Sequence, residues 1–306
     1  MELDYKFVYD IERYVMPPVK RVPPIPRPAM PTSSVSIPVS ASRTKKSFVV
    51  APWNGHGEGE KIIVYGASGM GKTTLVSLAP KPVFLGLDDG GRKLVDMETG
   101  EPIVLPHVPG LETFQDVRDA LTTPGLFDEY ETIVVDNATE LESWAERHIL
   151  SHVPLGKGSG GASSLNDYGY GKGYQHLYEV MKLPLQDVDP LVKAGKNVIF
   201  IAQAAPHNIA NPGGENFLRE GPRLYADKRF SVEACYCEWA DHVLRIDYQS
   251  VSVKEHKVRG STERVIYSAP EPHFRAKSRT LPPEASVVTF SNTKDDAIWQ
   301  WIFRKG

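Results

Sequence analysis

A glycine-rich segment, GASGMGKT at residues 66–73, has the composition and spacing of a loop that holds phosphate groups. Its glycines let the backbone direct consecutive N–H groups toward phosphate oxygens, and Lys72 supplies a positive charge for the terminal phosphates. Thr73 begins a predicted helix, whose N-terminus favours an anion, and its hydroxyl can ligate Mg²⁺. The complete GxxxxGK[ST] pattern therefore predicts a nucleotide site made of Gly66, Ala67, Ser68, Gly69, Met70, Gly71, Lys72, Thr73 and Thr74.

Asp136 is the residue that we expect to complete a magnesium site with Thr73. It follows the apolar run at 133–135 in TIVVDNA. The carboxylate that orients magnesium in P-loop proteins ends a buried strand beside the loop, and Asp136 has that position. An aspartate that caps the following helix is the alternative, but that interpretation leaves the metal without a second protein partner.

Hydrolysis would also require a group that polarises the attacking water. Asp88 and Asp89 follow an apolar run in VFLGLDDGG, and parallel strands present their carboxyl ends to one crevice, so either acid is a candidate base. A plain Asp-Gly turn is the alternative. Gln203 ends the run NVIFIAQ, where its amide can hydrogen-bond the water or the terminal phosphate and so sense the nucleotide; alternatively, it only begins a loop.

Apolar runs bounded by turn residues predict the strands that position these side chains. Helix-like patterns, with apolar residues three and four apart, lie between them at 113–123 and 138–150. Strands that alternate with helices indicate an α/β fold with a mostly parallel sheet covered on both faces. Alternation after residue 250 predicts antiparallel strands that close the sheet. The five predicted strands are 61–65, 82–87, 132–135, 197–201 and 242–246.

Two further segments lie at the ends of the chain. Prolines recur between residues 17 and 42 and block helix and sheet hydrogen bonding, so residues 1–45 are predicted to form an extended or disordered arm. Such an arm is either solvated or docks on a neighbouring subunit. At the other end, DDAIWQWIFRKG predicts a short helix that packs Ile298, Trp301 and Ile302 against the core.

Composition limits the classes of protein that the chain can belong to. Its 306 residues are 41% hydrophobic and 24% charged, which is typical of a soluble globular protein. A net charge of −3 excludes a surface coated in basic residues, so any nucleic-acid site must be a local patch. No apolar stretch approaches the roughly 20 residues that span a bilayer, and no signal peptide is recognised, so a cytoplasmic location is expected.

The two cysteines, Cys235 and Cys237, are separated by one residue. That spacing makes a disulfide between them geometrically awkward. A zinc site with nearby His242 fails as well, because structural zinc sites need four ligands and cysteines two to four residues apart. We therefore expect buried thiols close to the start of a strand.

Several motifs together resemble a known family. GASGMGKTT, FLGLDDGG, TIVVDNATELE, DYGYGKGY, VIFIAQ, ADHVLR and FRAKSRTLP are similar to segments of phage-encoded AAA-type nucleotide-binding proteins related to RecA, over roughly residues 48–292. That family includes single-domain recombinases that assist annealing of single-stranded DNA. The resemblance implies a RecA-like P-loop ATPase domain over 46–306, with ATP and Mg²⁺ bound between subunits of a ring or filament in the cytoplasm of a bacterial host.

The resemblance also assigns roles to individual residues. A family glutamate that activates water matches Asp88 or Asp89, which are one methylene shorter, so slow hydrolysis is implied. Family members often have histidine at this position. This chain has Gln203 instead, and RecA-type recombinases also have glutamine there. The family's Lys-x-Arg segment matches Lys277 and Arg279, which are expected to reach a neighbouring subunit's phosphates. Solvated surface charges are the alternative for this pair.

The long irregular stretches at 154–174 and 204–224 fall where RecA-like proteins place their DNA-contacting loops. Cations and aromatic rings suit single-stranded DNA, because bases stack on rings. If the tyrosines instead pack beneath a loop, no DNA contact follows. The first stretch offers Lys157, Tyr168, Tyr170, Lys172 and Tyr174; the second offers Asn208, Asn211, Arg219 and Arg223, with Glu215 and Glu220 weakening its basic character.

Three functional classes fit these observations. An ATP-dependent recombination, annealing or replication protein that acts on single-stranded DNA is favoured by the motif order and the loops, and a single-stranded DNA-binding protein is then an expected partner. A nucleotide-gated assembly or scaffold protein is the alternative, because of the acidic pI, the arm and the aspartates in place of glutamate. A P-loop kinase fits less well, since GKGSGGASS does not resemble an arginine-rich lid.

Overall fold

The structure is a computed structural model of the chain. It describes residues 50, 57–88, 90–96, 99–156, 161–249, 251–254, 257–260, 263–291 and 293–303. The chain divides into two units, Met1–Trp53 and Asn54–Gly306. The fold below is that of the second unit, and the predicted arm lies outside the described residues.

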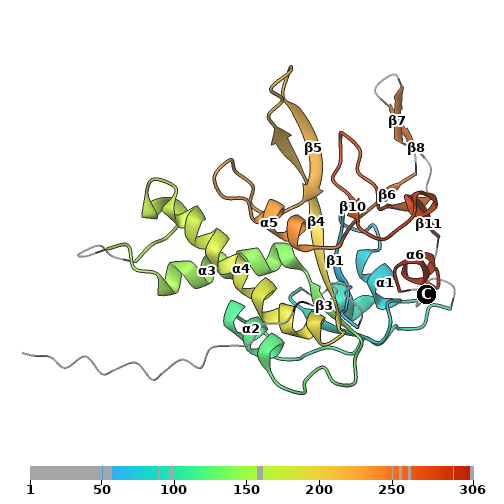
Figure 1. Cartoon of the computed structure of the whole chain (residues 1–306), viewed down its shortest axis with the longest axis horizontal. Coiled ribbons are helices and arrows are strands. Elements are labelled where there is room, and N and C mark those ends of the chain that lie inside the picture. The colour runs from blue at the N-terminus through green and yellow to red at the C-terminus, as the bar shows by residue number, and fades with distance from the viewer. Residues whose placement is uncertain are drawn as a thin grey trace, which may run out of the picture. The chain divides into compact units, whose positions relative to one another are not determined.

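A mostly parallel sheet forms the centre of this unit (Figure 1). Its parallel strands lie in the order β6-β1-β4-β3-β2, so that β4 separates the strand before the phosphate loop from the strand that carries Asp136. All five predicted strands are present, as β1 (Lys61–Gly66), β2 (Pro82–Gly86), β3 (Thr132–Asp136), β4 (Asn197–Ile209) and β6 (His242–Tyr248). A mostly parallel sheet of this kind is the fold class that the sequence predicts.

Antiparallel strands extend the sheet beyond β6, as the alternation after residue 250 predicts. The strand β9 (Arg264–Tyr267) pairs with β6, and β11 (Val287–Phe290) pairs with β9. A two-residue strand, β10 (Lys277–Ser278), pairs with the beginning of β6. The remaining strands, β7 (Val251–Lys254) and β8 (Lys257–Gly260), form a separate hairpin.

Helices cover both faces of the sheet, because successive side chains of each strand point to opposite faces. In β1, Ile63 and Tyr65 belong to one apolar cluster, whereas Ile62 and Val64 belong to the other. This arrangement explains why the parallel strands read as continuous apolar runs. The first cluster is covered by α2 (Phe114–Thr122), α3 (Ala138–His152), α4 (Lys172–Lys193) and α5 (Val232–Trp239), and the second by α1 (Lys72–Ser77) and α6 (Ala297–Ile302) (Figure 1).

Capping residues mark the beginning of the predicted helix α2. Thr113 and Asp116 form a capping box at the beginning of α2, in which each side chain accepts a backbone N–H of the other. Short 3₁₀ turns, η1 (Gly90–Lys93), η2 (Leu165–Tyr168) and η3 (Pro283–Ala285), connect other elements. No helix in the described part of the chain combines the length and apolarity needed to cross a membrane.

The prediction of a long loop at 204–224 is wrong. The strand β4 continues to Ile209 and pairs antiparallel with β5 (Phe217–Pro222), from Ala204 opposite Pro222 to Ile209 opposite Phe217. Pro206 made this extension hard to recognise, because proline lacks the N–H that a central strand donates. The proline is tolerated here, because β4 beyond Gln203 pairs with β5 and has left the registers with β1 and β3.

The stretch at 154–174 is only partly irregular. Residues 157–160 lie outside the described residues, whereas η2 and the first turn of α4 are regular structure. At the C-terminus, α6 packs on the core of its own unit as predicted, but with Trp299 buried beside Ile298 and Ile302 and Trp301 only half-buried. The Trp299 indole donates to Leu75 O at 2.7 Å, which ties α6 to α1.

Candidate nucleotide site

The predicted site residues converge at the carboxyl ends of the parallel strands. Gly66 lies opposite Gln203 in the β1–β4 register, and Asp136 lies opposite Ile201 in the β3–β4 register. The phosphate loop leaves β1 at this edge and enters α1 at Lys72. Ligands of open α/β sheets bind at such an edge, where the strand order reverses around the first strand.

Two glycines of the loop adopt left-handed backbone conformations, Gly69 with φ 79° and Gly71 with φ 89°. A side chain at Gly71 would also collide with its surroundings, because a Cβ there would lie 2.5 Å from Arg264 Nη1. Arg264 comes from β9, donates to Met70 O at 3.1 Å and lies over the Phe290 ring. This arginine supports the loop from outside, and no local sequence signal pointed to it.

Lys72 is buried within the loop, with 6% of its surface exposed. Its ammonium donates to Gly66 O at 2.9 Å, Ala67 O at 2.8 Å and Gln203 Oε1 at 3.0 Å. Burial lowers the pKa of Lys72 to about 8, and the nearby carboxylates of Asp136 and Asp88 oppose that shift. The ammonium therefore remains mostly protonated at neutral pH and keeps a positive charge at the loop.

Thr73 and Asp136 are in direct contact, since Thr73 Oγ1 donates to Asp136 Oδ2 at 2.8 Å. Burial raises the pKa of Asp136 to about 6, while the threonine hydrogen bond acts in the opposite direction. A hydroxyl and a carboxylate side by side are hard oxygen ligands that suit Mg²⁺. The alternative role for Asp136 as a helix cap is wrong, because Asn137 caps α3 by accepting the Glu140 N–H at 2.8 Å.

Asp88 lies at the same edge, close enough for its charge to raise the pKa of both Lys72 and Asp136. Its Oδ2 accepts a hydrogen bond of 2.6 Å from Asn137 Nδ2, and its Oδ1 accepts the Gly90 N–H at 2.9 Å. The second contact is that of the Asp-Gly turn, so the turn and a catalytic role are compatible. Asp89, the other candidate base, lies outside the described residues.

Gln203 is held by hydrogen bonds on both sides of its backbone. Its N–H donates to Thr139 Oγ1 at 3.1 Å, and its carbonyl accepts the Arg223 N–H at 2.6 Å. The Thr139 hydroxyl in turn donates to Arg223 O at 3.1 Å. Arg223 was predicted to belong to a DNA-contacting loop, but it directly follows β5, and its charge contributes to the lowered pKa of Lys72.

A family model described as an AAA domain matches residues 58–280. The chain belongs to this AAA domain family. Within it, the residues that the pattern assigns to nucleotide binding form one connected site. The glycine conformations, the buried ammonium and the Thr73–Asp136 pair all fit a nucleotide with its magnesium ion.

Other similarities of the AAA domain are weaker. It is 27% identical over 150 residues to YorG, an uncharacterized SPbeta prophage-derived protein of Bacillus subtilis, and the match covers 48% of this chain and 42% of that protein. The chain thus spans less than half the length of that relative. Among solved structures, a KaiC-like protein from Pyrococcus horikoshii matches with a TM-score of 0.36 and 15% identity, covering 76% of this chain and 90% of that one. The RadB recombinase matches with a TM-score of 0.37 and 15% identity, covering 78% and 89%.

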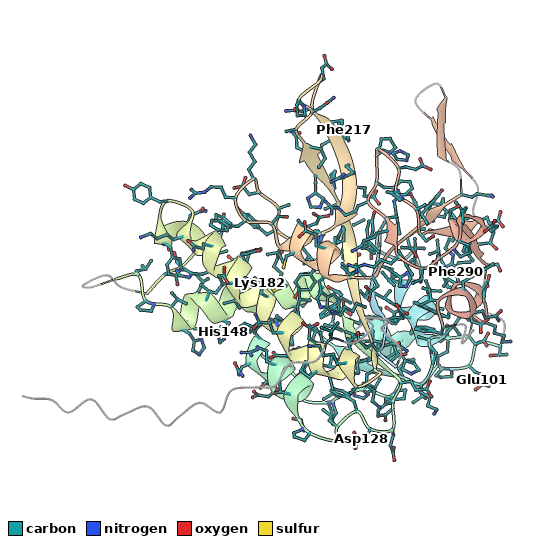
Figure 2. The ribbon with its side chains drawn as sticks, in the orientation of Figure 1. Glu101, Asp128, His148, Lys182, Phe217 and Phe290 are labelled. Carbon is teal, nitrogen blue, oxygen red and sulfur yellow. The ribbon has the colours of Figure 1, made fainter. Side chains whose placement is uncertain are left out.

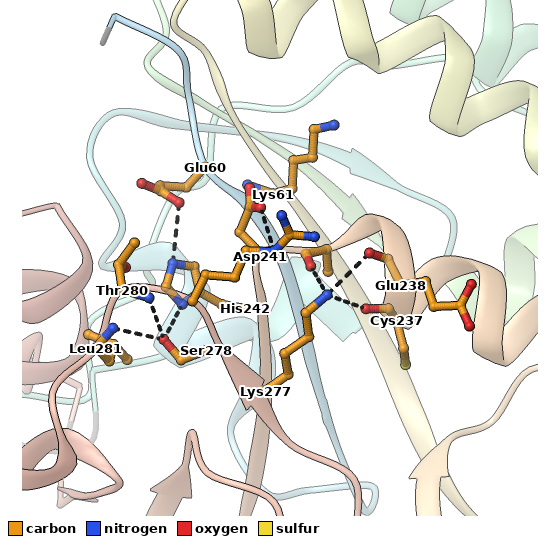
Figure 3. A network of polar contacts seen from close by, with 12 residues as sticks. Glu60, Lys61, Cys237, Glu238, Asp241, His242, Lys277, Ser278, Thr280 and Leu281 are labelled. Atoms are coloured by element: carbon orange, nitrogen blue, oxygen red, sulfur yellow. Dashed lines mark hydrogen bonds and ion pairs between the residues drawn. The ribbon is translucent and has the colours of Figure 1, made fainter. Parts of the chain in front are cut away.

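Lys277 and Arg279 do not approach the phosphate loop of their own AAA domain. Ser278, between them, pairs with His242 at the beginning of β6, whereas the loop follows the end of the parallel strand β1. Figure 3 shows the Lys277 ammonium directed at the C-terminal carbonyls of α5, donating to Cys237 O at 3.0 Å, Glu238 O at 3.1 Å and also Ala240 O. The solvated alternative is therefore wrong for Lys277, whose ammonium caps this helix.

Arg279 remains mostly exposed and pairs with Asp241 at 3.3 Å. His242 holds the strand β10 in place, because its ring nitrogens contact Ser278 Oγ at 3.0 Å and Glu60 Oε2 at 3.2 Å (Figure 3). A contact from Lys277 or Arg279 to a neighbour's phosphates stays a prediction. Within this chain, Arg279 is the freer of the two to make it.

The residues predicted to contact DNA have different environments in the AAA domain. Tyr168 is half-buried, and its hydroxyl donates to Ile149 O at 3.1 Å and Val153 O at 2.7 Å, so this ring packs on the chain and its contact with a base stays a prediction. Tyr170 is 97% exposed, and Lys172 is exposed at the start of α4. Tyr174 stacks on Tyr225, with centroids 4.5 Å apart. Lys157 lies outside the described residues, and Arg219 is half-buried on β5.

The cysteines lie on α5, the helix that precedes β6. Both are free thiols, with Cys237 buried and Cys235 half-buried. Burial raises the pKa of the Cys237 thiol, which keeps it protonated at neutral pH. In the part of the chain that the structure describes, no group of three histidine, cysteine or acidic residues is arranged to hold a metal ion.

Proposed function

We propose that this AAA domain hydrolyses ATP and that the nucleotide state controls its binding to single-stranded DNA during phage recombination, annealing or replication. The observation that carries this proposal is the hydrogen-bonded path from Lys72 through Gln203 to Thr139 and Arg223. It connects the phosphate loop to the base of the β4–β5 hairpin, which lies in one of the two segments predicted to contact DNA.

Nucleotide binding is assigned to the loop 66–73. Its backbone N–H groups and the Lys72 ammonium would hold the phosphates, while Thr73 and Asp136 would hold the magnesium ion. When bound, this ion would neutralise negative charge that develops on the phosphate oxygens. At neutral pH, Lys72 is cationic and Asp136 is mainly ionised, which is the charge state that both roles require.

Asp88 is the proposed base for hydrolysis. Asn137 and the Gly90 N–H each hold one of its oxygens, and the residue is exposed, so that water can reach it. In the proposed step, a water oxygen attacks the terminal phosphorus, its proton passes to Asp88, and ADP leaves.

Gln203 is the proposed sensor of the terminal phosphate. Its side-chain oxygen accepts a hydrogen bond from the Lys72 ammonium, which is also the group expected to bind that phosphate. If a phosphate accepts this hydrogen bond from Lys72 instead, the Gln203 side chain loses its partner and must move to another donor. The Gln203 backbone is hydrogen-bonded to Thr139 and Arg223, so a movement of Gln203 would displace the base of the hairpin.

Several exposed groups would suit single-stranded DNA. Tyr170 offers an exposed ring and Lys172, two residues further along the chain, an exposed cation. On the hairpin, which Figure 2 shows extending beyond the rest of the sheet, Phe217 is 39% exposed and Leu218 is 64% exposed. Aromatic stacking contributes about 1–3 kcal/mol per base, so a few such contacts give measurable binding without a strongly basic surface.

A homo-oligomer, ring or filament, belongs to this proposal. Arg279 is exposed at the end of the sheet opposite the phosphate loop, so that it would serve a neighbour's nucleotide and not its own. A cation supplied in this way makes hydrolysis depend on assembly. The alternative function is a nucleotide-gated assembly protein that does not respond to DNA. Asp88 favours it, because its side chain is one methylene shorter than the family's glutamate and both of its oxygens accept hydrogen bonds within the chain.

Steady-state ATP hydrolysis with and without single-stranded DNA tests the proposal. We expect magnesium-dependent turnover that DNA stimulates, and loss of both rates in Lys72→Ala. Lys193→Ala, an exposed lysine in the last turn of α4, is the matched control and should behave as the wild type. Hydrolysis or tight ATP binding with no response to DNA would support the assembly function instead.

A further inference from the structure

A cavity lies next to the sensor Gln203, between α3, the turn that leads into α4, and residues 223–225. Its volume is about 480 Å³, which is within the range of ligand pockets. Thr139 and Arg223, the two partners of the Gln203 backbone, line this cavity. The cavity therefore lies beside the nucleotide site, but no residue of the phosphate loop lines it.

One wall of the cavity is aromatic. Tyr174 and Tyr225 both line it, and their rings are stacked with centroids 4.5 Å apart and planes within 10° of parallel. The Tyr174 hydroxyl donates to Asn166 Oδ1 at 3.1 Å, which fixes the ring. A flat, oriented π surface of this kind accepts a planar ring by stacking.

A second wall is acidic. Glu142 and Glu146, one turn apart on α3, both line the cavity. Glu142 Oε1 accepts the Tyr225 N–H at 2.8 Å, which positions this carboxyl directly beside the aromatic wall. Burial, with the charge of Glu146, raises the pKa of Glu142 to about 7. Carboxyl oxygens placed in this way need hydrogen-bond donors from whatever occupies the cavity.

We propose that this cavity binds one base of single-stranded DNA and prefers cytosine and adenine, which carry an amino group at C4 or C6, over thymine. The base stacks on the tyrosine pair, its amino group donates to Glu142 and Glu146, and a phosphate beside it pairs with Arg223. Thymine has a carbonyl oxygen where cytosine has its amino group, and an ionised carboxylate, which Glu142 becomes as the pH rises above about 7, repels that oxygen. This inference rests on the proposed action on single-stranded DNA and adds to it a preference among bases.

The test measures binding of the full chain to cytosine, adenine and thymine homopolymers by fluorescence anisotropy. Each oligonucleotide is about 20 nucleotides long, which exceeds a site size of roughly 4–16 nucleotides. We expect the wild type to bind the cytosine and adenine oligonucleotides about tenfold more tightly than thymine. Glu142→Gln should reverse the order, because its amide donates to a thymine carbonyl and still accepts the Tyr225 N–H.

Two further variants make the result independent of folding defects. Glu146→Gln, which leaves the bond between Glu142 and Tyr225 in place, should also weaken the preference. Glu179→Gln is the matched control, since Glu179 is exposed on α4, pairs with Lys182 and does not line the cavity. The ratio between oligonucleotides is taken within each variant, so a partly unfolded sample does not alter it.

Either of two outcomes would overturn the inference. Equal binding of the three oligonucleotides, unchanged in Glu142→Gln and Glu146→Gln, would show that the cavity does not read bases, while the proposed binding of single-stranded DNA would stand. No binding of any oligonucleotide by the wild type would reject both the cavity's role and the proposed function.

Discussion

Lys72 and Gln203 are 131 residues apart in the sequence, yet the lysine ammonium donates to the glutamine side-chain oxygen at 3.0 Å. The contact arises because β4 lies next to β1 in parallel register, with Gly66 opposite Gln203. It places the phosphate-binding cation and an uncharged amide within one hydrogen-bond network. The same glutamine is fixed through its backbone to Thr139 and Arg223.

Replacing Thr139 tests this connection. Thr139→Val removes the hydroxyl that accepts from Gln203 N and donates to Arg223 O, at a cost of about 0.5–1.5 kcal/mol per hydrogen bond in the free energy of unfolding. We expect the ratio of the ATPase rates with and without DNA to fall toward one. Thr139→Ser restores the hydroxyl and should restore the ratio. A ratio that is the same in all three proteins would contradict the connection.

The phosphate loop should not tolerate a side chain at Gly71. Gly71→Ala meets Arg264 Nη1 at 2.5 Å and also carries the strain of a left-handed alanine, about 1–2 kcal/mol. We expect the affinity for a fluorescent ATP analogue to fall by about tenfold or more, because Arg264 and the loop must move apart.

Gly57 provides the matched control for this change. It has a similar φ of 86°, but a Cβ there meets no atom within 4 Å. Gly57→Ala should therefore carry the backbone strain and leave nucleotide affinity near that of the wild type. Equal losses of affinity in the two variants would mean that backbone strain, and not the contact with Arg264, explains the effect.

Glu142 should make the stability of the chain depend on pH. Its pKa is raised to about 7, so the folded chain holds this proton more tightly than the unfolded chain does. The carboxyl thus favours folding at acidic pH, and this contribution is lost as the pH rises through about 7. Glu142→Gln should be more stable than the wild type at about pH 8, by roughly 1–2 kcal/mol after allowance for partial solvent exposure.

Urea unfolding at several pH values measures this effect. The difference between Glu142→Gln and the wild type should shrink as the pH is lowered toward about 5, where the folded carboxyl is neutral. Glu179→Gln, on the exposed side of α4, serves as the reference for a surface carboxylate. A wild type that gains stability relative to Glu142→Gln as the pH rises would refute the assignment.

Lys277 and Arg279 should separate a structural role from a role between subunits. Lys277→Met removes charge-assisted hydrogen bonds to the end of α5, and we expect a loss of about 1.5–3 kcal/mol in the free energy of unfolding. Arg279→Met removes an exposed ion pair and should cost about 0.2–1 kcal/mol. Denaturant unfolding of the two variants measures both values.

The cross-subunit prediction adds a second measurement on the same pair. If Arg279 reaches a neighbour's phosphates, Arg279→Met should lower the ATPase rate per chain most at protein concentrations where the wild type self-associates. Lys81→Met, which removes another exposed ion-paired lysine, is the comparison. Equal rates for Arg279→Met and the wild type at every concentration would remove Arg279 from the proposed mechanism.

The sequence alone determined the phosphate loop, the five parallel strands and the metal role proposed for Asp136. These features depend on local rules: glycines where the backbone needs left-handed φ, apolar runs that can be buried on both faces, and a carboxylate directly after such a run. It also identified Gln203, because that residue ends one of the runs. Each of these signals lies within a few consecutive residues.

Other assignments needed the tertiary structure, because they depend on which distant segments meet. Arg264 contacts Met70 across 194 positions only because β9 and β6 place it beside the loop. Lys277 caps α5 because β10 pairs with the beginning of β6, the strand that directly follows this helix. Strand order and register decide such contacts, and neither can be read from the composition or the spacing of a single segment.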